Sequence, residues 1–181
     1  MKKRIPIVRT PFHIAAWFLV RAKSAGNDLT HKKLQHLIYI AYGKFFEINL
    51  EKKLIPATFI LSKIGPLDPN IYHLHKKVNL EDFGQDLDDS IEDFLNDIWS
   101  EFENFSDNEL LDKIFKNDVW GEISLNKIGS EIPEKLIIKS FVKNSQYKGE
   151  ANNIFDDDKE YWTLTGKKAE RWIPGISKKN R

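Results

Sequence analysis

Histidine is the residue type in this chain best suited to metal binding or proton transfer, because the chain has five histidines and no cysteine. His73 and His75 are two positions apart, and two such residues point in different directions on a helix. Paired metal ligands on a helix are instead spaced by four residues. His31 and His36 are five positions apart and diverge in the same way. The spacing therefore favours histidines that are solvated or buried in the core over a metal site.

Catalytic clusters could still form around two of these histidines. His31 has Asp28 and Lys32 close by in the sequence, and His73 has Tyr72 and His75 close by. However, the sequence contains no glycine-rich phosphate loop, no nucleophile elbow and no metal-binding signature. We therefore expect a protein that is not an enzyme, with no catalytic residues, no metal ligands and no cofactor.

One helix should organise the elements that position these side chains. The stretch from Leu29 to Tyr42 places apolar residues at three- and four-residue spacing, and the pattern continues beyond it. Thr30 is the expected N-cap, and the negative charge of Asp28 suits the dipole of the helix. The apolar face consists of Leu34, Leu37, Ile38, Ala41, Phe45 and Ile48. This pattern predicts a central core helix.

The rest of the chain predicts further helices around this one. Residues 54–63 are rich in β-branched and aromatic side chains, which predicts a short extended or β segment, and residues 64–67 predict a turn. Helices are expected to begin near Phe12, Pro69, Ser90, Ser106 and Pro133, with a polar surface loop over residues 79–89. With 41% hydrophobic residues among 181 positions, the expected fold class is mainly α, a compact single-domain helical bundle.

Charge is distributed unevenly along the chain, although the formal net charge is only +1. Residues 1–80 carry 14 Lys and Arg against 4 Asp and Glu, whereas residues 81–118 carry 2 against 14. Either the acidic helix lies beside the basic helices, or one face of the protein engages a charged partner. The sequence has no apolar run of membrane-spanning length, no secretion signal and no cysteine, so we expect a cytoplasmic protein without membrane contact.

Four segments follow one another in a characteristic order. They are Phe12–Leu19, Leu34–Ala41, Ile64-Gly65-Pro66 with Ile71-Tyr72, and Leu110–Trp120. Together they resemble the Panacea family, whose members are also called SocA-like antitoxins or phage-associated proteins, and the likeness covers about the first 120 residues. The motif positions that carry the resemblance, with an expected structural role, are Leu34, Gln35, Leu37, Tyr39, Gly65, Pro66, Tyr72 and Trp120.

The chain departs from the usual pattern of this family in several places. His36 stands where a lysine is usual in the central helix, and Ile64 replaces the tyrosine of a Tyr-Gly-Pro turn. Leu61-Ser62 replaces an alanine–tryptophan pair, and Ile114-Phe115 occupies a region in which Thr-His is typical. The chain therefore resembles a divergent member of the family.

This resemblance implies an antitoxin of a toxin–antitoxin system, which neutralises a cognate protein toxin by binding it directly. In the SocA-like case the antitoxin is also an adaptor that presents its toxin to a protease. Members of the family are paired with many unrelated toxins. The resemblance further implies that residues 1–122 form the antitoxin domain, followed by a C-terminal helical extension with a basic tail over residues 123–181.

Candidate contacts with the toxin lie in this extension, where aromatic and arginine side chains crowd together and could anchor a partner. They are Tyr161, Trp162, Arg171 and Trp172. The alternative is that these aromatic residues complete the hydrophobic core.

The alternative function is a nucleic-acid-binding protein that contacts its own promoter DNA, or a phage-related regulatory protein without enzymatic activity. The basic first half of the chain favours phosphate contacts. However, the acidic segment would repel a duplex unless it faced away, and no recognition motif is present.

Overall fold

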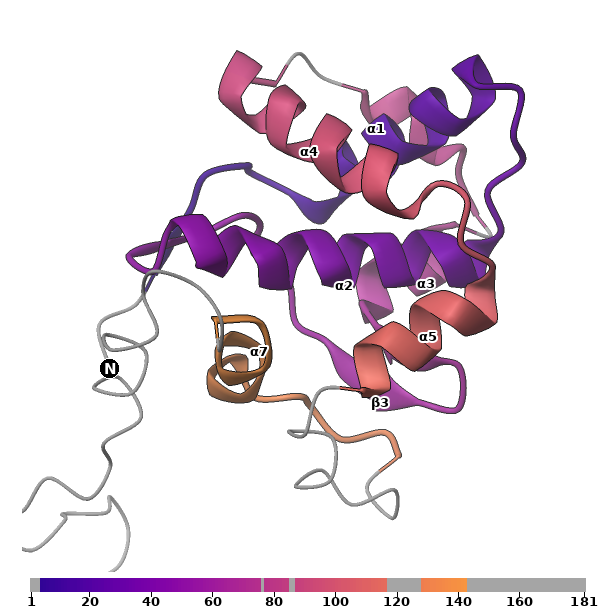
Figure 1. Cartoon of the computed structure of the whole chain (residues 1–181). Coiled ribbons are helices and arrows are strands. Elements are labelled where there is room, and N and C mark those ends of the chain that lie inside the picture. The colour runs from indigo at the N-terminus through magenta and orange to yellow at the C-terminus, as the bar shows by residue number, and fades with distance from the viewer. Residues whose placement is uncertain (1–3, 76, 85–86, 117–127, 143–181) are drawn as a thin grey trace, which may run out of the picture.

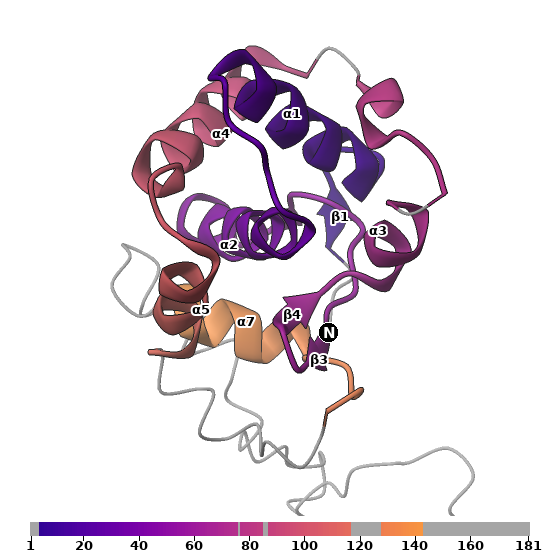
Figure 2. The same ribbon diagram turned by 90° about the vertical axis from the view of Figure 1, so that its right-hand side faces the viewer.

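Helix α2 (His31–Ile48) runs through the middle of the molecule, and the other elements cover it (Figure 1, Figure 2). The computed structural model describes residues 4–75, 77–84, 87–116 and 128–142. The other helices are α1 (Pro11–Ser24), α3 (Pro69–Leu74), η1 (a 3₁₀ helix, Leu80–Phe83), α4 (Asp89–Phe102), α5 (Asp107–Phe115) and α7 (Glu134–Phe141). α1 and α4 lie on one side of α2, and α5 and α7 lie on the other. The described chain is mainly α and has one continuous hydrophobic core, as the sequence predicts.

Helix α2 is the central core helix that the sequence predicts. The hydroxyl of Thr30 caps it by accepting a hydrogen bond from the amide of Lys33 at 3.0 Å. The buried residues of the predicted apolar face are Leu34, Leu37, Ile38, Ala41 and Phe45. The prediction for Ile48 is wrong, because the helix ends at this residue, which is 54% exposed.

The beginnings of the other helices follow the predicted signals with one exception. The carboxylate of Asp68 caps α3, and Ser106 forms the predicted reciprocal capping box with Glu109 at α5. Ser90 is not the N-cap of α4, because the helix already begins at Asp89 and Asp88 is its N-cap. Acidic residues suit the positive end of the helix dipole and allow this earlier start.

The strands are short and form two separate pairs. They are β1 (Ile5–Pro6), β2 (Lys52–Lys53), β3 (Ile60–Ser62) and β4 (Gly65–Leu67). β1 pairs in parallel with β2, and β3 pairs antiparallel with β4. Only the end of the predicted extended segment, residues 54–63, is strand. The turn predicted over residues 64–67 falls at Lys63-Ile64, so Gly65 and Pro66 lie in β4, an edge strand that tolerates proline.

The predicted surface loop over residues 79–89 contains helix η1, which packs against α1. Leu80 is buried, and the rings of Phe83 and Phe12 lie with centroids 5.2 Å apart. The prediction of a loop throughout this stretch is therefore wrong. The polar composition that suggested a loop belongs to the residues around two apolar anchors.

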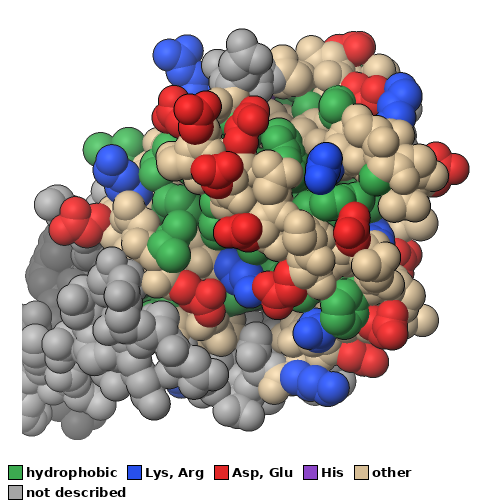
Figure 3. All heavy atoms as spheres, turned by 45° about the horizontal axis from the view of Figure 1, so that its top comes forward, with side chains coloured by type: hydrophobic (Ala, Val, Ile, Leu, Met, Phe, Trp, Pro, Cys, Tyr) green, Lys and Arg blue, Asp and Glu red, His purple; other side chains and the backbone are tan. Residues whose placement is uncertain are grey.

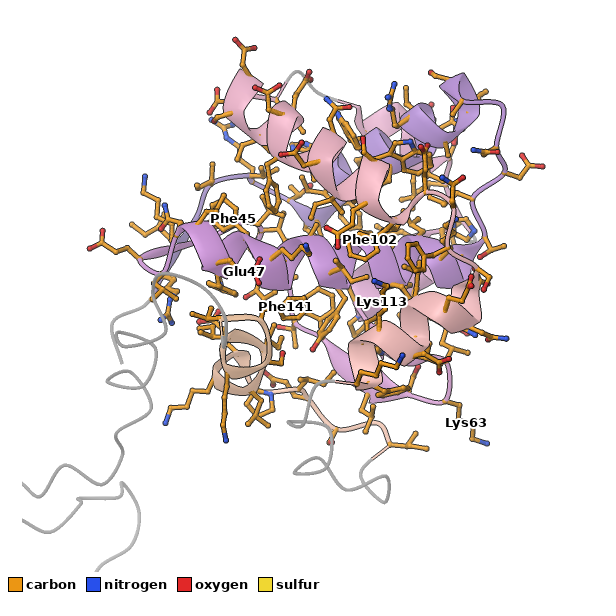
Figure 4. All side chains as sticks on the ribbon, viewed as in Figure 1. Phe45, Glu47, Lys63, Phe102, Lys113 and Phe141 are labelled. Carbon is orange, nitrogen blue, oxygen red and sulfur yellow. The ribbon has the colours of Figure 1, made fainter. Side chains whose placement is uncertain are left out.

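Helix α7 approaches α2 from the side opposite α4 (Figure 4). Phe45 of α2 points toward α4 and meets Phe94 with ring centroids 5.7 Å apart, whereas Phe141 of α7 reaches α2 from the other side. The Phe141 ring lies against Gly43, where a Cβ atom would collide with it. Glycine therefore allows α7 to pack directly on the backbone of α2.

Glu134, the first residue of α7, joins three parts of the chain. It accepts hydrogen bonds from Arg4 and from the hydroxyl of Tyr42, each at 2.9 Å, and Lys53 lies 3.7 Å away. Arg4 also donates to the carbonyl of Leu50 at 2.6 Å. Burial raises the pKa of the Tyr42 hydroxyl, and the charge of Glu134 raises it further, so Tyr42 stays protonated and donates. These contacts hold residues 134–141 on the common core, while the predicted domain boundary after residue 122 lies outside the described residues.

The contact between Phe141 of α7 and Gly43 predicts that the effect of Gly43→Ala on stability reverses when Phe141 is removed. Gly43→Ala should destabilise the protein by about 1–3 kcal/mol, because the new methyl group collides with the ring of Phe141. In a Phe141→Ala background, the same change should stabilise it by up to about 1 kcal/mol, because alanine is the better helix former. Urea unfolding followed by far-ultraviolet circular dichroism measures the change in stability in each background. A loss of stability of equal size in the two backgrounds would contradict the described packing of α7.

Candidate functional site

Two polar residues in the middle of α2, Gln35 and His36, are buried and connect this helix to the β3–β4 hairpin and to α3. The side-chain oxygen of Gln35 accepts a hydrogen bond from the amide of Asp68 at 2.8 Å, and its nitrogen lies 3.5 Å from the carbonyl oxygen of the same residue. Nε2 of His36 lies 2.7 Å from the carbonyl oxygen of Ile64. The motif of the central helix and the motif around Gly65-Pro66 therefore meet in one buried network.

His36 acts in this network as a neutral hydrogen-bond donor. Because a carbonyl oxygen only accepts, Nε2 of His36 carries the proton. Burial lowers the pKa of His36 from its ordinary value of 6.5, with the hydrogen bond to Ile64 opposing this change. Gly65 has a φ of +104°, and a Cβ atom there would lie 2.9 Å from Nε2 of His36. Only glycine lets the hairpin approach α2 this closely.

Asp68 joins the same network through its main chain and caps α3 with its side chain. The carboxylate accepts hydrogen bonds from the amides of Asn70 at 2.8 Å and Ile71 at 3.1 Å. Burial raises the pKa of Asp68, and these two hydrogen bonds oppose the rise. Since Gln35, His36 and Asp68 are each 0% exposed, the network positions secondary structure and cannot touch a dissolved substrate.

A second group of polar rings lies where α2 begins. His31 stacks on His75 with ring centroids 4.4 Å apart, and Tyr72 lies 5.2 Å from His31. Sequence spacing could not reveal this contact, because it joins the first residue of α2 to the end of α3. His73 is exposed and meets Tyr72 edge-on. In the part of the chain that the structure describes, no three His, Cys, Asp or Glu side chains are grouped so that they could hold a metal ion.

The residues singled out in the sequence fall into two groups. Leu34, Leu37 and Tyr39 are buried on α2, and Tyr72 is half-buried on α3. The last motif residue and all four candidate partner contacts lie outside the described residues; they are Trp120, Tyr161, Trp162, Arg171 and Trp172. The roles of these five residues stay predictions.

A groove between α1 and α4 is the surface feature that sequence reasoning missed. It encloses a cavity of about 350 Å³, whose lining includes His13, Trp17, Val20 and Arg21 from α1 and Glu92 and Asn96 from α4. His13, Trp17 and Arg21 are spaced by four residues and therefore share one face of α1. Their periodicity was the available signal, but nothing in the sequence shows which helix lies opposite this face.

Helix α4 keeps much of its negative charge on the solvent side (Figure 3). Glu101 pairs with Lys44 of α2 at 2.6 Å, so the acidic helix does lie beside a basic one. Asp89, Asp93 and Asp97 are exposed, and none has a Lys or Arg nitrogen within 4 Å among the described residues. Like charges spaced by four residues destabilise a helix by about 0.2–0.5 kcal/mol per pair. Ion pairs between α4 and the basic helices therefore account for only part of the negative charge of α4.

His36 makes the stability of the protein depend on pH. Because its pKa is lower in the folded than in the unfolded chain, the unfolded chain binds more protons below about pH 6.5, and stability falls as the pH drops. This contribution has a slope of at most about 1.4 kcal/mol per pH unit. His36→Gln keeps a donor for Ile64 but does not titrate, so it should reduce the pH dependence of urea unfolding between about pH 6.5 and 5.

The matched control is His73→Gln, which removes a histidine from the surface of α3. A pH dependence that is the same in His36→Gln as in the unsubstituted chain would contradict the neutral, buried state of His36.

None of the helices in the described ranges combines the length and apolarity needed to cross a bilayer. The chain matches no protein-family model, no curated protein and no solved structure.

Proposed function

We propose that this chain is an antitoxin of a toxin–antitoxin system, a divergent member of the Panacea family that neutralises a cognate toxin by direct protein–protein binding. It acts in the cytoplasm, whose reducing conditions suit a chain without cysteine. It works as a binding scaffold and not as an enzyme. The SocA-like role of an adaptor, which presents the bound toxin to a protease, extends the same binding activity.

The buried network around Gln35 is the observation that supports this proposal. The segments that give the resemblance are about 30 positions apart, yet hydrogen bonds join Gln35 to Asp68 and His36 to Ile64. Of the polar motif residues, Gln35 and Tyr39 are buried in the core, which suits a scaffold that leaves the recognition of partners to the surface. Such a division suits a family whose members share a sequence pattern but pair with many unrelated toxins.

Capture of the partner tests the proposal. The tagged chain is purified from its own cells, and the bound proteins are identified by mass spectrometry. We expect one stoichiometric partner that arrests growth when it is expressed alone and is silenced by co-expression with the chain. Leu37→Asp is the control that should capture nothing, because an unpaired charge in the core unfolds the domain.

Two outcomes would contradict the antitoxin proposal. One is a stoichiometric partner that does not arrest growth. The other is recovery of DNA in place of protein, with an affinity that falls steeply as salt is raised, which would favour nucleic-acid binding.

The C-terminal aromatic residues provide an independent test. Replacing both Trp162 and Trp172 with alanine should weaken binding of the captured toxin by about 30-fold or more, since truncating a single hot-spot residue costs about 2 kcal/mol or more. Isothermal titration calorimetry measures this affinity. If these tryptophans complete the hydrophobic core instead, the double variant will lower the midpoint of urea unfolding and leave the affinity of the folded protein unchanged.

A further inference from the structure

The groove between α1 and α4 continues into a second hollow. His13 lines both the cavity of about 350 Å³ beside Trp17 and Val20 and another of about 120 Å³ that reaches Arg9 and Asp88. The groove therefore follows α1 and extends past its first residue toward the N-terminal segment. An elongated groove of this kind suits a helix or an extended segment better than a compact metabolite.

The middle of the groove is apolar. Trp17 contacts the buried Phe18 edge-on, with ring centroids 5.3 Å apart, so a core residue supports its ring. Ala16 lines the cavity beside it, and Val20 is 46% exposed. A supported tryptophan next to an exposed aliphatic side chain is typical of the site that receives an apolar anchor in a protein interface.

The two walls of the groove differ in charge. On the α4 side, Glu92 and Asp88 line the cavities, and Asp93 continues the negative charge along the outer face of the helix. The α1 side carries Arg21 and, before the helix begins, Arg9. Figure 3 shows acidic side chains gathered on the face that carries α1 and α4, with hydrophobic side chains exposed between them.

We propose that this groove is a docking site for a basic amphipathic helix of the partner protein. Apolar side chains of that helix lie beside Trp17 and Val20, and its Lys or Arg side chains face α4. These cations would pair with Glu92 and Asp88, which line the cavities and have no Lys or Arg nitrogen within 4 Å among the described residues. That the partner is a toxin rests on the proposed function, whereas the preference for a basic helix does not.

Two synthetic peptides test this preference without the partner. Each has about 16 residues, about 24 Å long as a helix, with leucines on one face. One peptide carries lysines on the other face, and the second carries glutamates at the same positions. Fluorescence anisotropy with the full chain should show that the lysine peptide binds at least about tenfold more tightly, and more weakly as salt is raised. Equal binding of the two peptides would overturn the proposal.

Four single variants locate the binding site. Val20→Asp and Glu92→Lys change the groove, while Val78→Asp and Asp112→Lys make the same types of change at exposed positions that do not line it. The two groove variants should weaken binding of the lysine peptide by about tenfold or more, and the two controls by less than about twofold. An equal loss in the controls would show that the peptide binds elsewhere and would overturn the proposal.

Crosslinking separates this inference from the proposed function. Since the chain has no cysteine, Val20→Cys offers a single attachment point for a thiol-linked photocrosslinker, with Val78→Cys as the control. A captured toxin should crosslink to position 20 and not to position 78. A toxin that crosslinks to neither would overturn the docking site and leave the antitoxin function standing. Selective binding of the lysine peptide without a captured toxin would support the docking site and contradict the antitoxin function. A crosslink between two copies of the chain would overturn the docking proposal in favour of self-association.

Discussion

A buried glutamine–histidine pair determines how the described chain is arranged around its central helix. Gln35 and His36 interrupt the apolar surface of α2, and a buried polar group without a partner costs about 1–3 kcal/mol. Main-chain atoms of Ile64 and Asp68 supply the partners. Apolar burial alone is not directional, so these hydrogen bonds decide which residues of the hairpin and of α3 face α2. The pair therefore determines how the β3–β4 hairpin and α3 are aligned against α2.

The constraint leaves the outer faces of the molecule free to vary. On α2, the apolar side chains that pack against the other helices are buried in the common core. On α1 and α4, Arg21 and Asp93 are exposed and lie outside the hydrophobic core. The choice of charge at such positions is therefore open to selection by a partner.

Elements whose determinants lie within a few residues of one another could be predicted from the sequence. Thr30 at α2 and the Ser106 and Glu109 pair at α5 are of this kind, because a cap and its partner are three residues apart. The local signal at Gly65-Pro66 indicated a turn, but pairing with β3 makes this dipeptide part of a strand. A contact between distant segments can thus override the preference of a short stretch.

The candidate site shows the same limit. Periodicity along α1 could place His13, Trp17 and Arg21 on one face, yet it could not identify α4 as the opposite wall. The stacking of His31 on His75 was hidden for the same reason, since it depends on how α3 returns to α2. Residue spacing describes one helix, whereas a groove or a ring stack depends on how two helices pack against each other.

The packing of α7 has a consequence for how the protein is made. Arg4 lies at one end of the described chain and pairs with Glu134 near the other, and Phe141 of the same helix covers the flank of α2 around Gly43. Synthesis proceeds from the N-terminus, so a nascent chain carries α2 with this apolar flank open until Phe141 has left the ribosome. Exposed apolar surface of this kind promotes aggregation and recruits chaperones. The packing of α7 on α2 can therefore be completed only after the rest of the described chain has been synthesised.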